Sequence, residues 1–293
     1  MNPYRGFSLL VALLLFSTTL PGCEEFSSIW NGGNGTSSIT AYPISVGSEW
    51  AYNRALYSDN FRPIDSTYQF EHFSFSSSVT VRATKQILLP RNPGTMTDLI
   101  LATEFRSIES APLRPSYHYY TQSGGLLLLH GYIPSSLVFP RPINTSPAYC
   151  FANTTFRSLH EIMQFLEGPI STTIVDSITR EYPPLSSIKY PLATGDQWTF
   201  RPRGRPWRID KRTGDSRWDP QLQLQYFEVR WVYDLNDDGS WDNNIFIVDR
   251  ISARGLIRRA VTLLDILVID EMADEVGYVD YHEEYVVTSI SLP

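Results

Sequence analysis

The sequence predicts an all-β fold of antiparallel meander sheets, arranged as two tandem similar β units of half-barrel or sandwich type with one short helix between them. Runs rich in Val, Ile, Thr, Tyr and Phe alternate at short intervals with clusters of Gly, Pro and Asn, which is the pattern of antiparallel strands. Long amphipathic helical repeats are absent from the chain, and a frame at 42–52 recurs at 190–200. These observations together indicate a duplicated β architecture.

The composition describes a packed globular protein. Of its 293 residues, 42% are hydrophobic, 13% aromatic and only 19% charged, whereas disordered chains are poor in aromatic residues and rich in charge. The net charge is −7, and binding to duplex nucleic acid draws its affinity from clustered cations on phosphates. We therefore exclude nucleic acid as the main partner and expect two small domains or one large β domain.

Residues 1–22 are predicted to be a signal peptide. Arg5 precedes the apolar run 7–16, and "LPGC" ends at Cys23. Ten apolar residues are too few to span a bilayer as a finished helix, and a basic start with an apolar middle characterises secretory signals. The segment resembles the lipobox signals of bacterial lipoproteins, and this resemblance implies that Cys23 becomes the acylated first residue of the mature chain. Pro21 departs from the usual family residue, and an ordinary signal peptide with a coincidental Cys is the alternative.

Residues 23–40 are predicted to be a flexible tether, because their Ser-, Gly- and Asn-rich sequence cannot bury enough apolar surface to offset the entropy of ordering. The first β unit is predicted at 41–138 and the second at 190–293. Each unit runs through β-rich segments to a closing hairpin of aromatic and aliphatic residues.

The repeated frame consists of Tyr-Pro, an aliphatic residue, Gly, Trp and a further aromatic residue, at 42–52 and 190–200. Gly47 and Gly195 are expected to take a positive φ or to allow a close backbone approach. Each Trp should share one strand face with the aromatic residue two positions further on. The alternative to a duplication is one continuous sheet in which the two Trp motifs are separate strands.

The same frame resembles a loosely defined group of bacterial secreted proteins and lipoproteins that carry "FPL-x-x-G-x-x-W-x-Y" near the start and an aromatic "GVG-x-V" hairpin near the end. The resemblance covers 42–52 with 124–132, and 190–200 with 276–279. It implies a β-rich envelope protein and no particular chemistry. In the first half "GGLLLLHGY" departs from the hairpin pattern, which leaves the repeat boundary open.

Residues 139–189 are predicted to be a Pro-rich connector, since proline denies a sheet its backbone donors and breaks helices. One helix is predicted inside it at 158–167. Apolar residues recur there at helical spacing, Ser158 and Glu161 form a capping box, and Gly-Pro ends the segment. This helix should cover a sheet face or an open barrel end.

The sharpest local motif is "DLNDDGSWD" at 234–242, which resembles the calcium loops of EF-hands and dockerins. The resemblance implies a weak structural Ca²⁺ with oxygen ligands at alternating positions. The candidate ligands are Asp234, Asn236, Asp238, Ser240 through its carbonyl, and Asp242. Ile245 stands where the family has a bidentate acid, and the alternative is an Asx-rich hairpin turn.

A basic, Trp-containing segment opens the second unit. In an envelope protein such a segment could contact phosphate-bearing lipid head groups or an acidic glycan, because Arg binds oxyanions in bidentate fashion and Trp favours the membrane interface. The candidate contacts are Arg201, Arg203, Arg205, Trp207 and Arg208. The alternative is a solvated loop whose charge is balanced by the acidic stretch 265–284.

No catalytic residue is assigned. "HEIMQ" at 160–164 lacks the second His of a zincin helix, and neither a Ser-hydrolase signature nor a phosphate-binding Gly loop is present. Glu283 and Glu284 are strand neighbours that should face opposite sides of a sheet. Cys150 is expected to be a small buried hydrophobe.

The sequence thus predicts a lipid-anchored envelope lipoprotein, on the periplasmic or surface face of the outer membrane, with a non-catalytic binding or structural role. Its predicted partner is the bilayer, through acylated Cys23, with an envelope protein, a glycan or lipid head groups as further partners. Two alternatives stay open. One is an extracellular hydrolase with a dispersed active site, and the other is a lipid or lipoprotein carrier with an apolar cavity beneath the 158–167 helix.

Overall fold

The computed structural model describes residues 39–64, 74–92, 95–108, 111–112, 115–133, 147–167, 178–203, 207–270 and 275–293. Ser38–Pro293 form one compact unit. The predicted signal peptide, Cys23 and nearly all of the predicted tether lie outside the described residues. No helix in the described ranges is long and apolar enough to cross a membrane.

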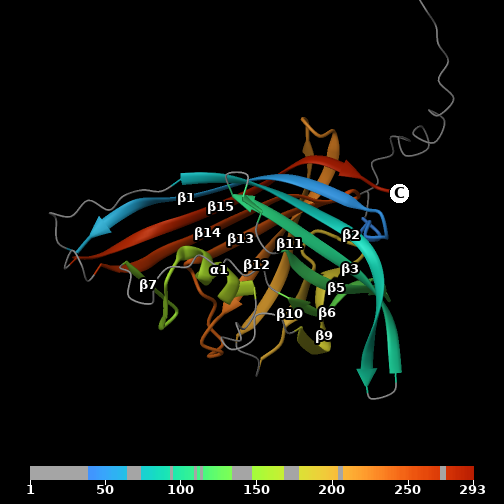
Figure 1. The fold of residues 1–293 in the computed structure, drawn as a ribbon, viewed down its shortest axis with the longest axis horizontal. Helices are drawn as coiled ribbons and strands as arrows, with labels where there is room; N and C mark the ends of the chain where they lie inside the picture. Colours follow the sequence, from blue (N-terminus) through green and yellow to red (C-terminus); the bar gives the residue numbers. More distant parts are fainter. Residues whose placement is uncertain are drawn as a thin grey trace, which may run out of the picture. The chain divides into compact units, whose positions relative to one another are not determined.

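The described residues contain fifteen strands in one antiparallel sheet and one short helix (Figure 1), which confirms the all-β prediction. The strands of the first half are β1 (Glu49–Pro63), β2 (Ser74–Asn92), β3 (Thr95–Ile108), β4 (Ala111–Pro112), β5 (Ser116–Ser123), β6 (Leu126–Ile133), β7 (Ala148–Phe151) and β8 (Thr154–Phe156). After helix α1 (Leu159–Glu167) come β9 (Thr179–Lys189), β10 (Gln197–Arg201), β11 (Arg208–Asp219), β12 (Leu224–Asp234), β13 (Ile245–Ser252), β14 (Gly255–Asp270) and β15 (Glu275–Ser291).

The two predicted units share this sheet. Its main order is β10-β11-β12-β13-β14-β15-β1-β2-β3-β5-β6-β9, with β4 beside β3 and with β7 beside β14 and β8. Strands from 41–138 form one meander and strands from 190–293 form the other, and the pairing of β1 with β15 joins them. The arrangement is therefore the single continuous sheet that we gave as the alternative, while a duplication as its origin stays a prediction.

The repeated frame has the same backbone geometry at both places. Gly47 and Gly195 have φ values of +96° and +81°, as expected. The Gly47 N–H donates to the Ala83 carbonyl at 2.7 Å, and the Gly195 N–H donates to the Thr213 carbonyl at 2.9 Å. Each frame therefore attaches the start of one strand, β1 or β10, to the following strand, β2 or β11.

The connector prediction for 139–189 needs correction, because this range contributes strands β7, β8 and β9 to the sheet. Pro183 and Pro184 lie within β9. Among the described residues β9 is an edge strand that pairs only with β6, and an edge strand tolerates proline because one row of its N–H groups needs no ladder partner. Pro183 and Pro184 therefore lie in an edge strand and do not interrupt the sheet.

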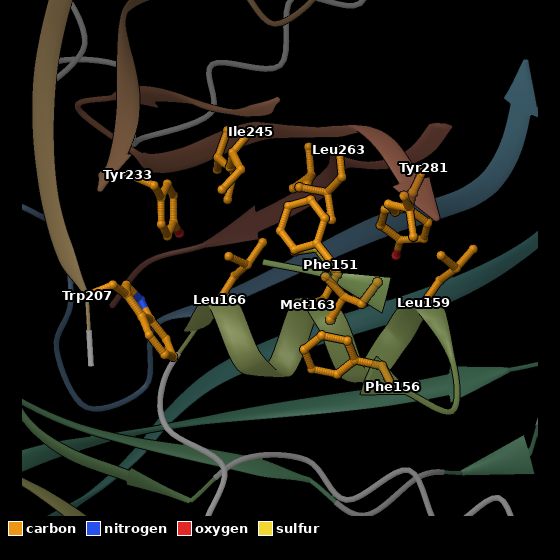
Figure 2. Close-up of a cluster of buried hydrophobic side chains, with 14 of the residues drawn as sticks. Phe151, Phe156, Leu159, Met163, Leu166, Trp207, Tyr233, Ile245, Leu263 and Tyr281 are labelled. Carbon is orange, nitrogen blue, oxygen red and sulfur yellow. The ribbon is translucent and has the colours of Figure 1, made fainter. Parts of the chain in front are cut away.

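Helix α1 lies within the predicted range, one residue after its predicted start. The Ser158 hydroxyl accepts the Glu161 N–H at 3.2 Å, and the Glu161 carboxylate accepts the Arg157 N–H at 2.7 Å. Ile162 and Leu166 are completely buried. Figure 2 shows the apolar side of this helix lying against side chains of the sheet, so it covers a sheet face as expected.

Two apolar clusters fill the inner face of the sheet. The helix-side cluster contains α1 residues together with residues such as Leu56, Phe151, Phe200, Trp207, Ile209, Tyr233, Ile247, Val261 and Tyr281. We call the second cluster the entry-side cluster, because it contains Ile39, where the described chain begins. Its other members include Trp50, Tyr52, Leu192, Tyr226, Phe227, Val229, Ile251, Ile257 and Val287. Strands β1, β6, β9 and β12 to β15 supply both clusters, and the boundary between them holds the polar residues described next.

Candidate functional site

A band of charged side chains crosses the inner face between the two apolar clusters. We call it the polar belt. It consists of five charged residues and one tryptophan: Arg54, Lys211, Asp249, Arg259, Glu283 and Trp231. On β13 the inward residues Ile247 and Ile251 belong to different clusters, and Asp249 lies between them. The strand register aligns the belt, because Asp249 pairs with Arg259 and Lys211 pairs with Trp231.

An ion pair between Arg259 and Asp249 forms the centre of the belt. Arg259 donates to the two carboxylate oxygens of Asp249 at 2.6 and 3.0 Å, and the Trp231 indole N–H donates to Asp249 at 2.8 Å. Burial disfavours the charge of Asp249, but the bidentate guanidinium outweighs this effect and holds the pKa of Asp249 below its ordinary value. Asp249 is therefore an ionised, fully satisfied acceptor inside the sheet.

Lys211 adds a second cation to the belt. Its Nζ donates to the Ser187 carbonyl at 2.7 Å and lies 3.6 Å from the Trp231 ring centroid and 4.6 Å from that of Phe200. Burial lowers the pKa of Lys211 from 10.5 to about 7, against the opposing attraction of Asp249. Aromatic faces and one carbonyl thus replace the water that normally stabilises an ammonium group.

Arg54 and Glu283 form the third part of the belt. They make a short buried ion pair in which each side chain is 1% exposed. The Tyr281 hydroxyl donates to the Glu283 carboxylate at 3.0 Å, and the Arg54 guanidinium lies over the Tyr285 ring at 5.4 Å. The expected separation of Glu283 from Glu284 is confirmed, because Glu284 instead contacts the partly exposed Arg258.

The belt is arranged for holding strands together more than for chemistry. Arg54, Lys211, Asp249 and Glu283 are each at most 3% exposed, so a substrate has no direct access to them. A buried ion pair is costly to break because removal of one partner leaves an uncompensated charge. The sequence signal for these residues is one charged side chain at a period-2 position between apolar ones, and this signal identifies them only once the buried face of each strand is known.

A triad-like arrangement lies on the outer face, and we call it the outer triad. The His282 Nδ1 lies 3.2 Å from the Thr262 hydroxyl, and the His282 Nε2 lies 3.0 Å from the Asp59 carboxylate. The Tyr57 ring stacks on the imidazole with centroids 4.7 Å apart. Thr262 and His282 are paired in register on β14 and β15, and both strands have neighbours on each side.

The outer triad has the residue types of a hydrolase. A hydrolase also needs donors directed at the developing oxyanion. The backbone N–H groups of Thr262 and His282 lie in strands that are paired on both sides, where the ladder uses them. Sequence reasoning did not predict this arrangement, because Thr262 and Asp59 are distant from His282 along the chain.

The predicted calcium loop forms the turn between β12 and β13. The two carboxylate oxygens of Asp234 accept the N–H groups of Asp238 at 3.1 Å and Gly239 at 3.0 Å. Asp238 accepts the Ser240 N–H at 2.7 Å, and Asp242 accepts the Leu235 N–H at 2.8 Å. These are the bonds of an Asx-type turn.

The carboxylates of Asp234, Asp238 and Asp242 are engaged by backbone N–H groups of the loop. Asn236 is exposed, and the Asp234 carboxylate is occupied by backbone donors. In the ranges that the structure covers, no group of three or more His, Cys, Asp or Glu side chains is placed to hold a metal. The turn interpretation accounts for the observed contacts, and calcium binding stays a prediction.

The proposed anionic-ligand contacts do not form one exposed surface. Arg201 is fully buried, 3.7 Å from Glu181, and Trp207 is 4% exposed and packs on Phe165 of α1. Burial removes both side chains from the surface that this interpretation needs. The exposed guanidinium of Arg203 is 3.2 Å from Asp237.

Of the remaining two residues of that segment, only Arg208 is described. The Arg208 guanidinium pairs with Asp210 at 2.5 Å, and Arg205 lies outside the described residues. Cys150 lies on β7 with intermediate exposure, and its sulfur is 3.6 Å from the Thr155 hydroxyl, so it is less buried than we expected.

Comparisons with known proteins give distant likenesses only. No protein-family model and no curated protein matches the sequence. A Bacteroides fragilis protein described as exported, with a YmcC-like fold, is 8% identical with a TM-score of 0.35, over 86% of this chain and 99% of that one. A Parabacteroides distasonis protein described as a lipoprotein is 11% identical with a TM-score of 0.30, over 86% and 99%. A β-barrel-like domain from Brucella abortus is 9% identical with a TM-score of 0.26, over 85% and 99%. Likenesses at such TM-scores carry no argument about this chain.

Proposed function

We propose that this chain is an acyl-anchored envelope lipoprotein of the outer membrane whose β domain has a non-catalytic binding or structural role. The anchor rests on the "LPGC" sequence that ends at Cys23 behind a short apolar segment. The non-catalytic role rests chiefly on the polar belt, because four of its five charged side chains are buried and the fifth, the partly exposed Arg259, is paired with Asp249.

The carrier alternative has less support. It requires an apolar cavity beneath α1, and the described side chains on that side of the helix pack directly against the sheet (Figure 2). Burial of Leu159, Met163 and Leu166 against the helix-side cluster fills the region where an acyl chain would have to lie.

The anchor is tested by replacing Cys23 with Ala. We expect the variant to leave the membrane fraction and to lose acyl labelling, because one sulfur carries the lipid. Cys150→Ala is the matched control, since it removes the other cysteine of the chain and should leave fractionation unchanged. Membrane retention of Cys23→Ala without acyl label would contradict the proposal.

A hydrolase is the second candidate, and the outer triad is the observation that favours it. With the proton on Nε2, His282 would donate to Asp59 and could accept the Thr262 proton through Nδ1, which is the division of roles in a catalytic triad. His282→Ala should then abolish hydrolysis of short nitrophenyl esters. His130→Ala is the matched control, because His130 also contacts a threonine, Thr121, at 2.8 Å.

We expect the purified chain to show no ester hydrolysis above that of His282→Ala. Saturable hydrolysis that His282→Ala removes and His130→Ala preserves would replace the non-catalytic proposal with the hydrolase.

A further inference from the structure

The hairpin between β11 and β12 projects beyond its neighbours. β11 and β12 pair with each other from Arg208 and Asp234 out to Asp219 and Leu224. On one side, the pairing of β10 with β11 ends at Gln197 and Arg212. The pairing of β12 with β13 on the other side ends at Tyr226 and Ser252. Residues 214–225, which we call the hairpin tip, therefore extend past β10 by about 20 Å on one side and past β13 by about 7 Å on the other, at the rise of a β-strand.

The hairpin tip exposes apolar side chains in an ordered turn. Trp218 is 50% exposed and Leu222 is 36% exposed. The Asp219 carboxylate accepts the N–H groups of Gln221 at 2.9 Å and Leu222 at 3.0 Å, which fixes the turn. The Arg217 guanidinium is 57% exposed, with Glu228 at 3.7 Å. An exposed Trp beside an Arg is the combination that favours a membrane interface, where the indole lies at head-group depth and the guanidinium contacts phosphate.

The hairpin tip lies at the end of the sheet where the described chain begins. The Ile39 carbonyl accepts the Leu192 N–H at 3.1 Å, and three residues after Leu192 the Gly195 N–H donates to the Thr213 carbonyl at 2.9 Å. Thr213 directly precedes the hairpin tip. Leu224, at the other side of the tip, packs against the cluster that contains Ile39 and Leu192.

The predicted lipid anchor is separated from Ile39 by fifteen residues, 24–38. A Ser- and Gly-rich linker of that length has a mean end-to-end distance of about 20 Å and a maximum of about 50 Å. The bilayer is thus within reach of this end of the sheet. Short tethers give millimolar effective concentrations, so two apolar side chains suffice for a contact that would be too weak without the anchor.

From these observations we propose that the hairpin tip is a membrane-contact element, with Trp218 and Leu222 inserted at the head-group level of the bilayer that carries the anchor. This inference rests on the proposed acyl anchor. The membrane contact also gives the β domain an orientation, with the end of the sheet that contains Ile39 and the hairpin tip facing the membrane.

The test uses the full acylated chain carrying Trp30→Phe, because Trp30 lies seven residues after the predicted anchor. The chain is placed in vesicles of phosphatidylethanolamine and phosphatidylglycerol, prepared with and without brominated acyl chains. Brominated lipids should quench part of the tryptophan emission, and Trp218→Phe should remove most of that quenching. Trp241→Phe is the matched control, because Trp241 lies in the turn between β12 and β13, at the opposite end of β12. Leu222→Ser should reduce the quenching at least twofold while leaving Trp218 in place.

Quenching that persists in Trp218→Phe, or that Trp241→Phe removes instead, would overturn the contact while leaving the anchor intact. An unacylated Cys23, detected separately by mass spectrometry, would overturn both proposals. Because Trp218 is half-exposed at a turn, its replacement should leave the melting temperature within about 2 °C of the parent, which separates loss of contact from loss of fold.

Discussion

The charge of Lys211 depends strongly on the surrounding fold. Its ammonium group is enclosed by the Trp231 and Phe200 rings and bonded to one carbonyl. Asp249 attracts this ammonium group and favours its charged form, but the same carboxylate is also paired with Arg259. The charged form of Lys211 therefore lowers the free energy of unfolding, and this loss of stability is largest at pH values below the pKa of Lys211 in the folded protein.

The pKa of Lys211 is about 7 in the folded protein and near 10.4 in an unfolded chain. Between these values the unfolded state binds more protons, so stability rises with pH through this window, and the full cost is present below about pH 7. Lys211→Met should therefore gain stability relative to the parent by about 2–5 kcal/mol more at pH 6 than at pH 9.5. Denaturant melts at both pH values check this.

Lys189→Met is the control for that experiment, because Lys189 is 42% exposed and pairs with Asp196 across 3.6 Å. Its effect should not differ between the two pH values by more than about 0.5 kcal/mol. An equal effect of Lys211→Met at pH 6 and pH 9.5 would mean that the Lys211 ammonium is not desolvated as described.

Among the elements, the turn between β12 and β13 has a sequence that fits both an Asx-type turn and a calcium loop. Asp234 is 1% exposed and accepts two backbone N–H groups. Asp234→Ala should lower the free energy of unfolding by about 1–3 kcal/mol, because it removes the acceptor of two turn hydrogen bonds. This loss should be the same in calcium and in chelator, as measured by thermal melts.

Asn236→Ala is the comparison for the loop, since its exposed side chain makes no described contact with the turn. A calcium-dependent rise in melting temperature that disappears in Asp234→Ala, Asp238→Ala and Asn236→Ala would contradict the turn interpretation and support an ion.

Elements with local signals could be predicted from the sequence, and elements that depend on distant pairing could not. The capping box near Ser158 and the positive φ of Gly47 and Gly195 depend on a few neighbouring residues, and all appear in the structure. Strand β9 was missed because its prolines are unfavourable in a sheet interior, and only its place at the edge makes them acceptable. The outer triad was missed for a related reason, since strand register alone brings Asp59 beside His282.

At the scale of the whole sheet, the two meanders are joined by different means at their two junctions. β1 and β15 form a backbone ladder, whereas in the described residues no ladder joins β9 to β10. Side chains span that second junction, which we call the seam. The Trp198 indole donates to the Ser186 carbonyl at 2.9 Å, and Lys211 donates to the Ser187 carbonyl at 2.7 Å. The sheet is thus continuous by backbone at one junction and held by side chains at the other.

Because side-chain bonds replace a ladder there, the seam should open at a lower free-energy cost than the rest of the sheet. We expect the amides of β9 and β10 to exchange with solvent faster than those of β15, and Trp198→Phe to accelerate exchange in β9 and β10 by about 5–10-fold, which corresponds to the loss of one hydrogen bond. Trp50→Phe is the matched control from the other copy of the frame, since the Trp50 indole donates to the Arg254 carbonyl at 2.7 Å beside the intact ladder. Hydrogen exchange read by mass spectrometry should show no selective change at the seam in that control. Acceleration spread evenly over all strands in Trp198→Phe would mean that the sheet opens as one unit and that the seam is not its weak point.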